Sequence, residues 1–594
     1  MNKQALIIDI ETNNLAGDEI WCVGLVSDDL FINNCIEWDE DTTPAYLSQL
    51  FEEYIPVFHN AKFDVRVLRE HGVHIEPGSY WDTMVMSYVW NPRREQGHGL
   101  ESWGKELGTL KAVDDGVHSD DGWVWNDTTK ERIKRYCLQD CIVTLKLFEY
   151  LLGKLKTDPK AMALLQDIEL PFIDCLIEME STGFYIDVDA SKSMVTELEQ
   201  RQGELLSEMS SVVPFVPGKE VVYKKGYYKR NGEVFYSRCE LDEFNPSSSR
   251  HIIWALTTLY GWEPEKFTPS GQPATDADTL EGLEYPLTVL LNEYSVLVKM
   301  HGMVTGYMER LDGRRLYGNF NQVVTKTGRL SSSDPNLQNI PTNGVWGKKM
   351  RSLFCSPGAG WKMVGCDLSN IEGRVLAHYL SLVCKETRMA ETFAAGVDFH
   401  QANADAWGVT RKEAKTLLYA ICYGAGAAKV GGGDKKRGQQ LMDTVDANMP
   451  ALKRLKEMVW ETCRKRGGLI HSQFGRRLYY PEINESYAMR KAQGDKREAK
   501  QLVAQAERRV FNALLQGTAA DVLKHIVLTV WRDSQLDYGA YLIANVHDEG
   551  LYYVPDEYAD IFALRLEETF ALPLLSHCPI MGEPKTGMNW NDIH

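Results

Sequence analysis

Hydrophobic residues along this chain follow two different spacings. Short apolar runs of strand length occur at 5–10, 20–26, 362–366, 469–480, 541–546 and 550–554. Apolar residues three or four positions apart predict helices over 130–152, 164–180, 191–212, 250–260, 370–382, 411–423, 440–466 and 497–532. A chain of 594 residues is too long for one hydrophobic core. The interleaved strands and helices therefore predict an α/β protein with several domains.

Breaks in these patterns divide the chain into segments. A polar stretch with Pro159 ends the first α/β unit, and residues 214–243 show β alternation around an Asn231–Gly232 hairpin signal. The run 429–438, rich in glycine and lysine, predicts a flexible basic loop. These breaks give three segments, about 1–155, 160–310 and 310–594. The finer division into 1–157, 158–320, 321–390, 391–500 and 501–594 rests on the family resemblance given below.

Composition excludes several classes of protein. No stretch approaches the roughly 20 apolar residues of a membrane span, and the strand 5–10 leaves no room for a targeting peptide before it. The twelve cysteines are scattered, and the closest pair is Cys137 and Cys141. The absence of any C-x-x-C pair argues against a zinc site or a disulfide framework, and it favours a reducing cytosol. We expect a cytoplasmic protein without a membrane partner.

The formal net charge of −18 is unusual for a protein that binds nucleic acid. Binding depends on the local field, however, and basic residues gather locally. These clusters are Lys348, Lys349 and Arg351; Lys435, Lys436 and Arg437; Arg464, Lys465 and Arg466; Arg476 and Arg477. Such runs are usually solvated faces, so charge alone leaves nucleic-acid binding open.

Acidic residues lie at the ends of predicted elements in the first segment. Asp9 and Glu11 end the first strand, where residues two apart point to the same face. Asp64 ends HNAKFD, and Tyr136 and Asp140 lie one turn apart on the helix 130–152. Several carboxylates can hold two divalent ions about 3.5–4 Å apart and so assist phosphodiester hydrolysis. Asp-x-Glu alone is more often an acidic strand end, so the three pieces count only together.

The order D-x-E, N-x-x-F-D and Y-x-x-x-D resembles the exonuclease motifs of DEDD-type proofreading nucleases, in their Tyr-containing branch. The resemblance covers about the first 150 residues and implies an RNase H-like 3′→5′ exonuclease domain. It also implies two divalent ions held by Asp9, Glu11, Asp64 and Asp140, with Tyr136 orienting the attacking water.

Two more aspartates, far apart in the sequence, follow predicted strands. Asp367 comes after WKMVGC, and Asp548 lies between the runs 541–546 and 550–554. If folding joins these strands, the two carboxylates can hold the ion pair needed for phosphoryl transfer. A lone aspartate after a strand is more often a turn residue, so the neighbouring motifs must decide.

The helix 411–423 carries a stripe of functional side chains. Arg411, Lys415, Tyr419 and Tyr423 recur every four residues, whereas Ala414, Leu417, Leu418 and Ile421 lie away from the stripe and can pack. Cations suit the phosphates of a nucleoside triphosphate, and aromatic rings suit its base and sugar. An ordinary amphipathic helix remains the alternative for this pattern on its own.

Five segments resemble motifs of family A DNA polymerases, the DNA polymerase I-like family. CDLSNIEGRVLAHYL (366–380), RKEAKTLLYAICYG (411–424) and VHDEG (546–550) resemble motifs A, B and C. TKTGRLSSSDPNLQNIP (325–341) and FNALLQGTAADVLK (511–524) resemble two further signatures. The resemblance spans essentially the whole chain and implies a right-hand polymerase that follows the exonuclease domain. The thumb would be 158–320, the palm 321–390 and 501–594, and the fingers 391–500.

The resemblance implies a template-directed DNA polymerase that uses two Mg²⁺ ions at its polymerase site, with Asp367, Leu368 and Asp548 as ligands. The residues around the incoming dNTP would be His400, Arg411, Lys415, Tyr419, Tyr423 and Glu372. Lys415 would donate a proton to pyrophosphate, and Glu372 with Tyr423 would exclude a 2′-hydroxyl. Tyrosine at 419 implies tolerance of dideoxynucleotides. The residues near the primer end would be Arg329, Gln516 and His547, the first two probing the minor groove. The basic clusters, among them Arg476 and Arg477, would contact the duplex backbone.

Some segments resemble replicative polymerases of short-tailed bacteriophages in particular. They are YGAGAAKVGGGDKKRG (423–438), FNPSSSRHI (244–252) and GMNWNDIH (587–594). We therefore expect phage genome replication, with primer-template DNA and dNTPs as partners and a phage helicase-primase or single-strand binding protein as candidate partners.

Well-known members of this group capture thioredoxin through a long insertion before the thumb segment. The corresponding region here, about 214–243, is short and argues against thioredoxin binding. Asn370 and Gly373 depart from motif A.

Three alternatives stay open at this stage. A single-subunit RNA polymerase would share the palm, although Glu372 and the nuclease motifs argue against it. In a nuclease whose polymerase half only binds DNA, the intact Asp367, Asp548, Arg411 and Lys415 would be unexplained. An accessory DNA-binding subunit would leave both carboxylate sets unexplained.

Overall fold

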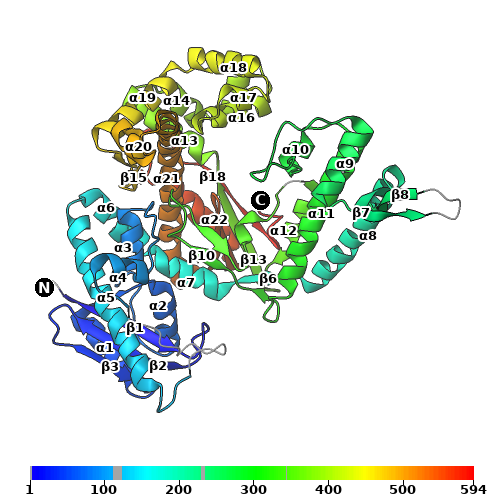
Figure 1. The fold of residues 1–594 in the computed structure, drawn as a ribbon. Coiled ribbons are helices and arrows are strands. Elements are labelled where there is room, and N and C mark those ends of the chain that lie inside the picture. Colours follow the sequence, from blue (N-terminus) through cyan, green and yellow to red (C-terminus); the bar gives the residue numbers. More distant parts are fainter. Residues whose placement is uncertain (1–2, 112–123, 229–233, 343) are drawn as a thin grey trace. The chain divides into compact units, whose positions relative to one another are not determined.

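The computed structural model describes residues 3–111, 124–228, 234–342 and 344–594 (Figure 1). The chain divides into two compact units. Unit 1 comprises Met1–Gly183, Gly318–Asn339 and Ser356–His594, and unit 2 comprises Phe184–Tyr317 and Ile340–Cys355. Both predicted carboxylate sets belong to unit 1.

A five-stranded sheet forms the first part of unit 1. Its strands are β1 (Gln4–Thr12), β2 (Ile20–Ser27), β3 (Asn33–Glu37), β4 (Tyr54–Phe58) and β5 (Trp81–Asp82), in the order β3-β2-β1-β4-β5. β1 pairs antiparallel with β2 and parallel with β4. Every residue of β2 is buried, as its continuous apolar run predicts for a strand covered on both faces.

Helices cover this sheet and continue the chain toward the second sheet. They are α1 (Thr43–Glu53), α2 (Ala61–Glu70), α3 (Thr83–Trp90), α4 (Leu100–Leu107), α5 (Lys130–Lys156), α6 (Pro159–Leu164) and α7 (Phe172–Thr182). α5 packs on β1 and β2 through a buried apolar side. The helix predicted over 164–180 is interrupted by a π-helical segment, η1 (Leu165–Glu169), and by Pro171, which cannot donate a backbone hydrogen bond.

A four-stranded antiparallel sheet forms the second part of unit 1. Its order is β16 (Tyr541–Val546), β17 (Glu549–Pro555), β13 (Trp361–Leu368) and β18 (Gly582–Gly587). The helices α13 (Ile371–Cys384), α21 (Lys496–Tyr538) and α22 (Ala559–Glu568) pack near it. Two short strands precede it, β10 (Asn319–Asn321) and β11 (Ser331–Ser333), followed by the turn η2 (Leu337–Asn339), and η4 (Thr569–Ala571) follows α22.

A group of helices lies near the N-terminal half of α21 (Figure 1). It contains α14 (Arg388–Ala394), α15 (Phe399–Trp407), α16 (Arg411–Cys422), α17 (Ala427–Val430), α18 (Lys435–Asn448), α19 (Pro450–Lys465) and α20 (Glu485–Lys491). Between α19 and α20 lie a short hairpin of β14 (Leu469–His471) and β15 (Arg477–Tyr479), and then η3 (Pro481–Ile483).

Three predictions about this region are wrong in detail. The basic loop expected at 429–438 is partly helical, because the Asp434 side chain caps the start of α18. The helix expected over 440–466 breaks at Met449, since Pro450 starts a new helix. The strand expected over 469–480 is two strands, β14 and β15, joined by a turn that contains Gly475 at φ +95°.

Helix α21 is the one helix among the described residues that is long and apolar enough to cross a membrane by length and composition. Of its most apolar window, 83% is buried inside the protein. The prediction that no stretch approaches a membrane span in apolar length is therefore wrong for α21, and its burial is typical of a core helix.

Unit 2 is built around two long helices, α8 (Val188–Val212) and α11 (Pro286–Met308), which pack on each other. It also contains α9 (Ser249–Tyr260), α10 (Ala277–Glu281), α12 (Gly344–Ser352) and a small sheet in the order β12 (Phe354–Cys355), β6 (Phe184–Ile186) and β9 (Arg315–Leu316). β7 (Phe215–Tyr228) and β8 (Val234–Glu243) form an antiparallel hairpin. The predicted Asn231–Gly232 turn lies outside the described residues.

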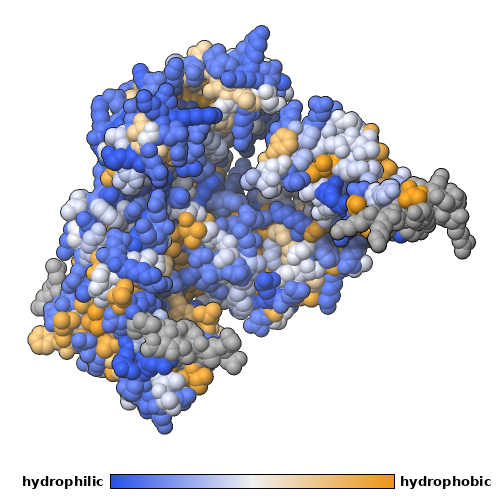
Figure 2. Space-filling model, viewed as in Figure 1, coloured by the Kyte–Doolittle hydropathy of each residue, from blue (hydrophilic) through white to orange (hydrophobic). Residues whose placement is uncertain are grey.

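The face seen in Figure 2 is mainly hydrophilic, and apolar residues on it occur in small scattered groups. Buried hydrophobic residues instead form continuous cores, one of which joins β1, β2, β4, α5 and η1. This core includes Ile8 and Ile10 at the end of β1, beside Asp9 and Glu11.

Two candidate active sites

The first candidate site, the N-terminal acidic site, gathers carboxylates from one strand and two helices. Asp9 and Glu11 lie at the end of β1, Asp64 on α2 and Asp140 on α5. The four carboxylates are close enough to repel one another electrostatically. Asp64 is 7% exposed and Asp140 5% exposed. The fold therefore brings together the four acidic residues singled out in the first segment.

Burial raises the pKa of all four acids, and repulsion between neighbouring carboxylates adds to the rise at Asp9 and Glu11. Desolvation raises the pKa of Glu11 to about 8, and the charges of Asp140 and Asp64 add to the rise. Desolvation raises the pKa of Asp64 to about 8, and it also raises the pKa of Asp9 and of Asp140. Oδ1 of Asp140 is buried without a hydrogen-bond partner. Oxygen atoms concentrated in this way are suited to hard divalent cations.

Lys111 belongs to the N-terminal acidic site, although the sequence analysis did not select it. Its Nζ lies 2.6 Å from Oδ2 of Asp140 and 5.0 Å from the ring centre of Tyr136. The Asp140 charge raises the pKa of Lys111, which remains a cation. Lys111 lies in an irregular segment without periodicity, so no pattern in the sequence marks it.

A buried aspartate, Asp82, orients the element that carries Asp64. Its carboxylate accepts hydrogen bonds from the backbone N–H groups of Asn60 and Ala61, at the start of α2. It also accepts from Met84 and Val85 at the start of α3. One carboxylate thus caps two helices, and an Asp-Thr pair before an apolar run was the available signal.

The second candidate site, the palm acidic site, lies where β13 ends beside the β16–β17 turn. Asp367 pairs with Glu549 across the β13–β17 ladder, and the N–H of Leu368 donates to the carbonyl oxygen of Asp548 at 3.0 Å. This register places two aspartates that are 181 positions apart at neighbouring strand ends. Desolvation raises the pKa of Asp367 to about 6, and the charge of Asp548 adds to it.

Glu372 is the centre of a hydrogen-bonded group beside the palm acidic site. Arg329 donates to its Oε1 at 2.6 Å, and the Tyr423 hydroxyl donates to its Oε2. Arg329 also lies 3.5 Å from Oδ1 of Asp548, and the Gln516 side chain lies close enough to the Tyr423 hydroxyl to lower its pKa. Four of the predicted nucleotide-binding and DNA-binding residues therefore share one network.

Asn370 and Gly373, the two departures from motif A, act together. Asn370 has φ +52° at the start of α13; its Oδ1 accepts from the Tyr419 hydroxyl, and its Nδ2 lies 3.2 Å from Nε2 of His400. A Cβ at position 373 would lie 2.8 Å from Oδ1 of Asn370. Glycine therefore leaves space for a side chain that links α13 to α15 and α16.

The stripe on α16 borders a cavity of about 910 Å³, whose lining includes Asp367, Glu372, Arg411, Lys415, Tyr419 and Asp548. The predicted packing residues of α16 (Ala414, Leu417, Leu418 and Ile421) are buried. Arg411 pairs with Asp398 at 2.6 Å. Desolvation and the charge of Lys415 lower the pKa of His400. Cationic, aromatic and acidic side chains thus line the same cavity.

The two remaining predictions have different outcomes. His547 is exposed in the β16–β17 turn with φ +54°, and it lies near Arg329 in a smaller pocket. The proposed DNA contact by Arg476 and Arg477 is wrong. Arg476 is 2% exposed and pairs with Glu169 and Asp521. Arg477 pairs with Asp158 and donates to the carbonyl oxygen of Trp90.

Comparisons with known proteins show the family to which the chain belongs. The chain matches the family profile "DNA polymerase family A" over residues 226–592 and the profile "3′-5′ exonuclease" over residues 4–156. It is 30% identical to DNA polymerase I of Pseudomonas aeruginosa over 584 residues, which cover 94% of this chain and 59% of that protein. It is also 30% identical to the thermostable DNA polymerase I of Thermus filiformis, over 89% of this chain and 56% of that protein. The chain thus spans less than two thirds of these relatives.

A solved structure has a similar fold. It is the POL domain of Pol1 from M. smegmatis in complex with DNA primer-template and dNTP, with a TM-score of 0.81 at 22% identity. The match covers 100% of this chain and 96% of that one. The predicted fold class is confirmed: a 3′-5′ exonuclease domain precedes a polymerase domain. Because the family profile matches more than half of the chain, this protein belongs to DNA polymerase family A.

Proposed function

We propose that this protein is a template-directed DNA polymerase that extends a primer 3′ end with dNTPs and removes mispaired ends by 3′→5′ excision. One observation carries the proposal. The two strand-end aspartates and the Arg411–Lys415–Tyr419 stripe line the same cavity of about 910 Å³. That lining matches a nucleoside triphosphate whose α-phosphate faces the carboxylates.

In the palm acidic site, Asp367 and Asp548 would hold two Mg²⁺ ions, and Leu368 could contribute only its backbone carbonyl oxygen. These ions would neutralise charge on the attacking and leaving oxygens. The raised pKa of Asp367 fits this assignment, because burial and then the neighbouring charge of Asp548 destabilise the ionised carboxylate, which a bound cation would stabilise.

The side chains on α15 and α16 would bind and orient the dNTP. Arg411, Lys415 and His400 would contact its phosphates, and Lys415 would donate a proton to the departing pyrophosphate. Tyr419 and Tyr423 would contact the sugar and base. Because Tyr423 is hydrogen-bonded to Glu372, this pair would occupy the space that a 2′-hydroxyl needs. Arg329, Gln516 and His547 would contact DNA at the primer end.

In the N-terminal acidic site, Asp9, Glu11, Asp64 and Asp140 would hold two divalent ions, and Tyr136 would orient the attacking water. The unpartnered buried Oδ1 of Asp140 supports this assignment. Lys111 would keep the free site from accumulating negative charge.

The test uses a 5′-labelled primer on a longer template with Mg²⁺, incubated with dNTPs, with NTPs or without nucleotides. We expect extension with dNTPs, little extension with NTPs, and shortening without nucleotides. Asp548→Ala should abolish extension and leave shortening, whereas Asp9→Ala with Glu11→Ala should do the reverse. Asp560→Ala on α22, an exposed acid without a role in either site, is the matched control. Loss of both activities in either active-site variant would contradict the two-site assignment.

We further propose that the chain replicates a phage genome. The segments 423–438 and 244–252 and the short 214–243 region support this placement, whereas the relatives reported above are bacterial. We expect long products on a primed single-stranded circle when a phage helicase-primase and single-strand binding protein are added, without thioredoxin. Products of a few nucleotides under all conditions would instead favour a repair enzyme.

A further inference from the structure

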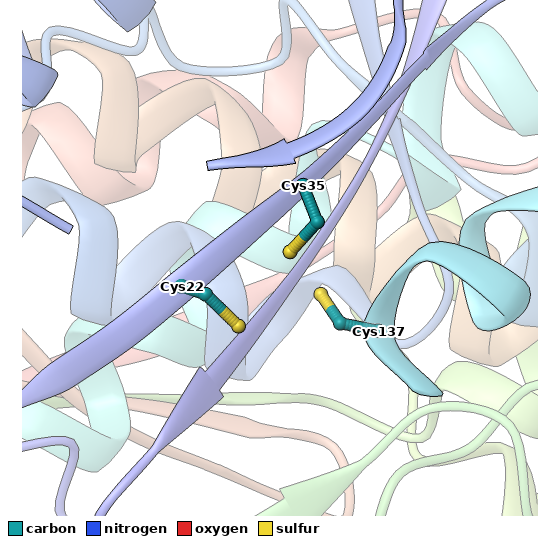
Figure 3. A group of neighbouring side chains, drawn as sticks. All are labelled: Cys22, Cys35 and Cys137. Carbon is teal, nitrogen blue, oxygen red and sulfur yellow. The ribbon is translucent and has the colours of Figure 1, made fainter. Parts of the chain in front are cut away.

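Three cysteine side chains from separate elements meet beside the N-terminal acidic site. Cys22 lies on β2, Cys35 on β3 and Cys137 on α5. Their Sγ atoms all lie within 4.8 Å of one another. Figure 3 shows the three sulfurs pointing into one shared space between the strands and the helix. Cys22 and Cys137 are buried, whereas Cys35 is partly exposed. This group is the thiol cluster.

The strand register explains why these thiols converge. Cys22 pairs with Glu37 and Gly24 pairs with Cys35, so the two cysteines are diagonal neighbours on one sheet face. Gly24 leaves this face open, since a Cβ there would lie 3.0 Å from Sγ of Cys137 and 2.8 Å from Sγ of Cys141. The prediction of no zinc site rested on the absence of C-x-x-C pairs in the sequence. That spacing gives no information about cysteines that strand register brings together.

We propose that the thiol cluster binds one thiophilic divalent cation of the Zn²⁺ class. Tetrahedral zinc with Zn–S bonds of about 2.3 Å places sulfurs roughly 3.8 Å apart, a separation compatible with the observed limit of 4.8 Å. Thiolates select soft cations, whereas the neighbouring carboxylates suit Mg²⁺. Binding replaces the thiol protons, which are released to solvent. Cys35, the partly exposed member, provides the entry path.

The surroundings offer a fourth ligand. Glu11 pairs with Cys22 across the β1–β2 ladder, so both side chains lie on the same sheet face. Oxygen atoms of Asp9 and Glu11 also lie within 4.8 Å of Sγ of Cys137, and the Cys137 thiol donates to the carbonyl oxygen of Asp9 at 3.3 Å. Cys137 thus belongs both to the thiol cluster and to the edge of the N-terminal acidic site. A cation on the thiols would draw Glu11 away from that site.

The competing explanation is that the cysteines only fill space. Buried cysteine behaves as a small hydrophobic residue, and Trp21 and Ile133 complete an apolar cluster around Cys22 and Cys137. Packing alone predicts no preference for soft cations, so metal binding separates the two explanations.

The test uses the full chain, freed of metal with a chelator and kept reduced, and titrated with Cd²⁺. Cadmium thiolates absorb in the ultraviolet, which reports sulfur ligation directly. We expect one thiolate-bound Cd²⁺ per chain, displaced by Zn²⁺ but not by excess Mg²⁺. Cys35→Ser should weaken binding by at least about 100-fold, more than the loss of an outer-sphere contact. Cys239→Ser, which removes an exposed cysteine on β8, should leave binding unchanged.

Two results would overturn the site: no thiolate absorption in the unsubstituted chain, or absorption of full strength in Cys35→Ser. The first needs no variant, so it holds even if Cys35→Ser folds poorly.

A second measurement rests on the proposed excision activity. One equivalent of Zn²⁺ should slow 3′→5′ shortening in the unsubstituted chain but not in Cys35→Ser, and it should spare extension. Binding without slowing would refute the link to excision alone, and absence of shortening in the Zn²⁺-free chain would refute the proposed excision instead.

Discussion

The N-terminal acidic site should make the metal-free protein less stable as pH rises. Glu11 and Asp64 have ordinary pKa values of 4.5 and 3.8, and the folded protein raises both to about 8. At pH values between the ordinary and the raised pKa, the folded state keeps protons that the unfolded chain has released. Stability from this source is therefore fully present below about pH 4 and is lost as pH rises through 8.

The size of the effect follows from proton counting. Each additional proton held by the folded state changes the free energy of unfolding by about 1.36 kcal/mol per pH unit. From about pH 5.5 to about pH 7.5, one retained proton corresponds to a loss of about 2.7 kcal/mol. Because the carboxylates titrate together, the loss belongs to the group rather than to one residue. Mg²⁺ should restore the loss, since a cation bound only to the folded state stabilises it by mass action.

Amide hydrogen exchange in β1 and β2 is the suitable measurement, because a chain with several domains has no single free energy of unfolding. Exchange is followed in chelator at both pH values and corrected for the intrinsic exchange rate. The double variant Glu11→Gln with Asp64→Asn should lose most of the pH dependence, and Asp560→Asn should keep it. Equal slopes in the unsubstituted chain and the double variant, or protection that increases with pH, would refute the reasoning.

Three further predictions concern residues that sequence motifs alone do not explain. Arg476→Met leaves buried carboxylates unpaired and should cost about 3–5 kcal/mol of local stability, whereas Arg388→Met on an exposed pair should cost less than about 1 kcal/mol. Amide hydrogen exchange around each site measures the two losses. Gly373→Ala should displace Asn370 and lower kcat/KM for dNTPs about tenfold, the equivalent of one lost hydrogen bond, and normal incorporation would contradict this account. Lys111→Met removes a cation from the N-terminal acidic site, so excision should need less Mg²⁺ for half-saturation; an increased requirement would show that Lys111 supports metal binding.

Sequence reasoning succeeded where one short segment contains both the functional residues and their local structure. The α16 stripe is such a case, because helical periodicity alone separates Arg411 and Lys415 from the buried Leu417 and Leu418. Strand-end aspartates were also recognisable, since an acidic residue after a continuous apolar run is a local signal. The partnership between Asp367 and Asp548 needed family resemblance, because strand register decides it.

Reasoning failed where function depends on pairing between distant side chains. Lys111 lies in an irregular segment, and its role depends on its 2.6 Å approach to Asp140. The thiol cluster depends on the β2–β3 register and on the position of α5. Arg476 was interpreted as a surface cation because neighbouring residues are basic, yet its partners come from η1 and α21. Local composition contains no information about such partners.

The burial of Arg476 also bears on how the two sites depend on each other. Its guanidinium pairs with Glu169 of η1 and Asp521 of α21, and Lys524 reaches both Glu169 oxygens at 2.9 Å. These four charged side chains join η1, which follows the first sheet in the chain, to α21, which packs on the four-stranded sheet. Gly328 at φ +87° packs on the same guanidinium, one residue before Arg329 at the palm acidic site. Disturbing this junction should therefore impair excision and synthesis together, whereas changing a single carboxylate set should separate them. A loss of both activities in Arg476→Met would then identify a structural fault and would not count against two independent sites.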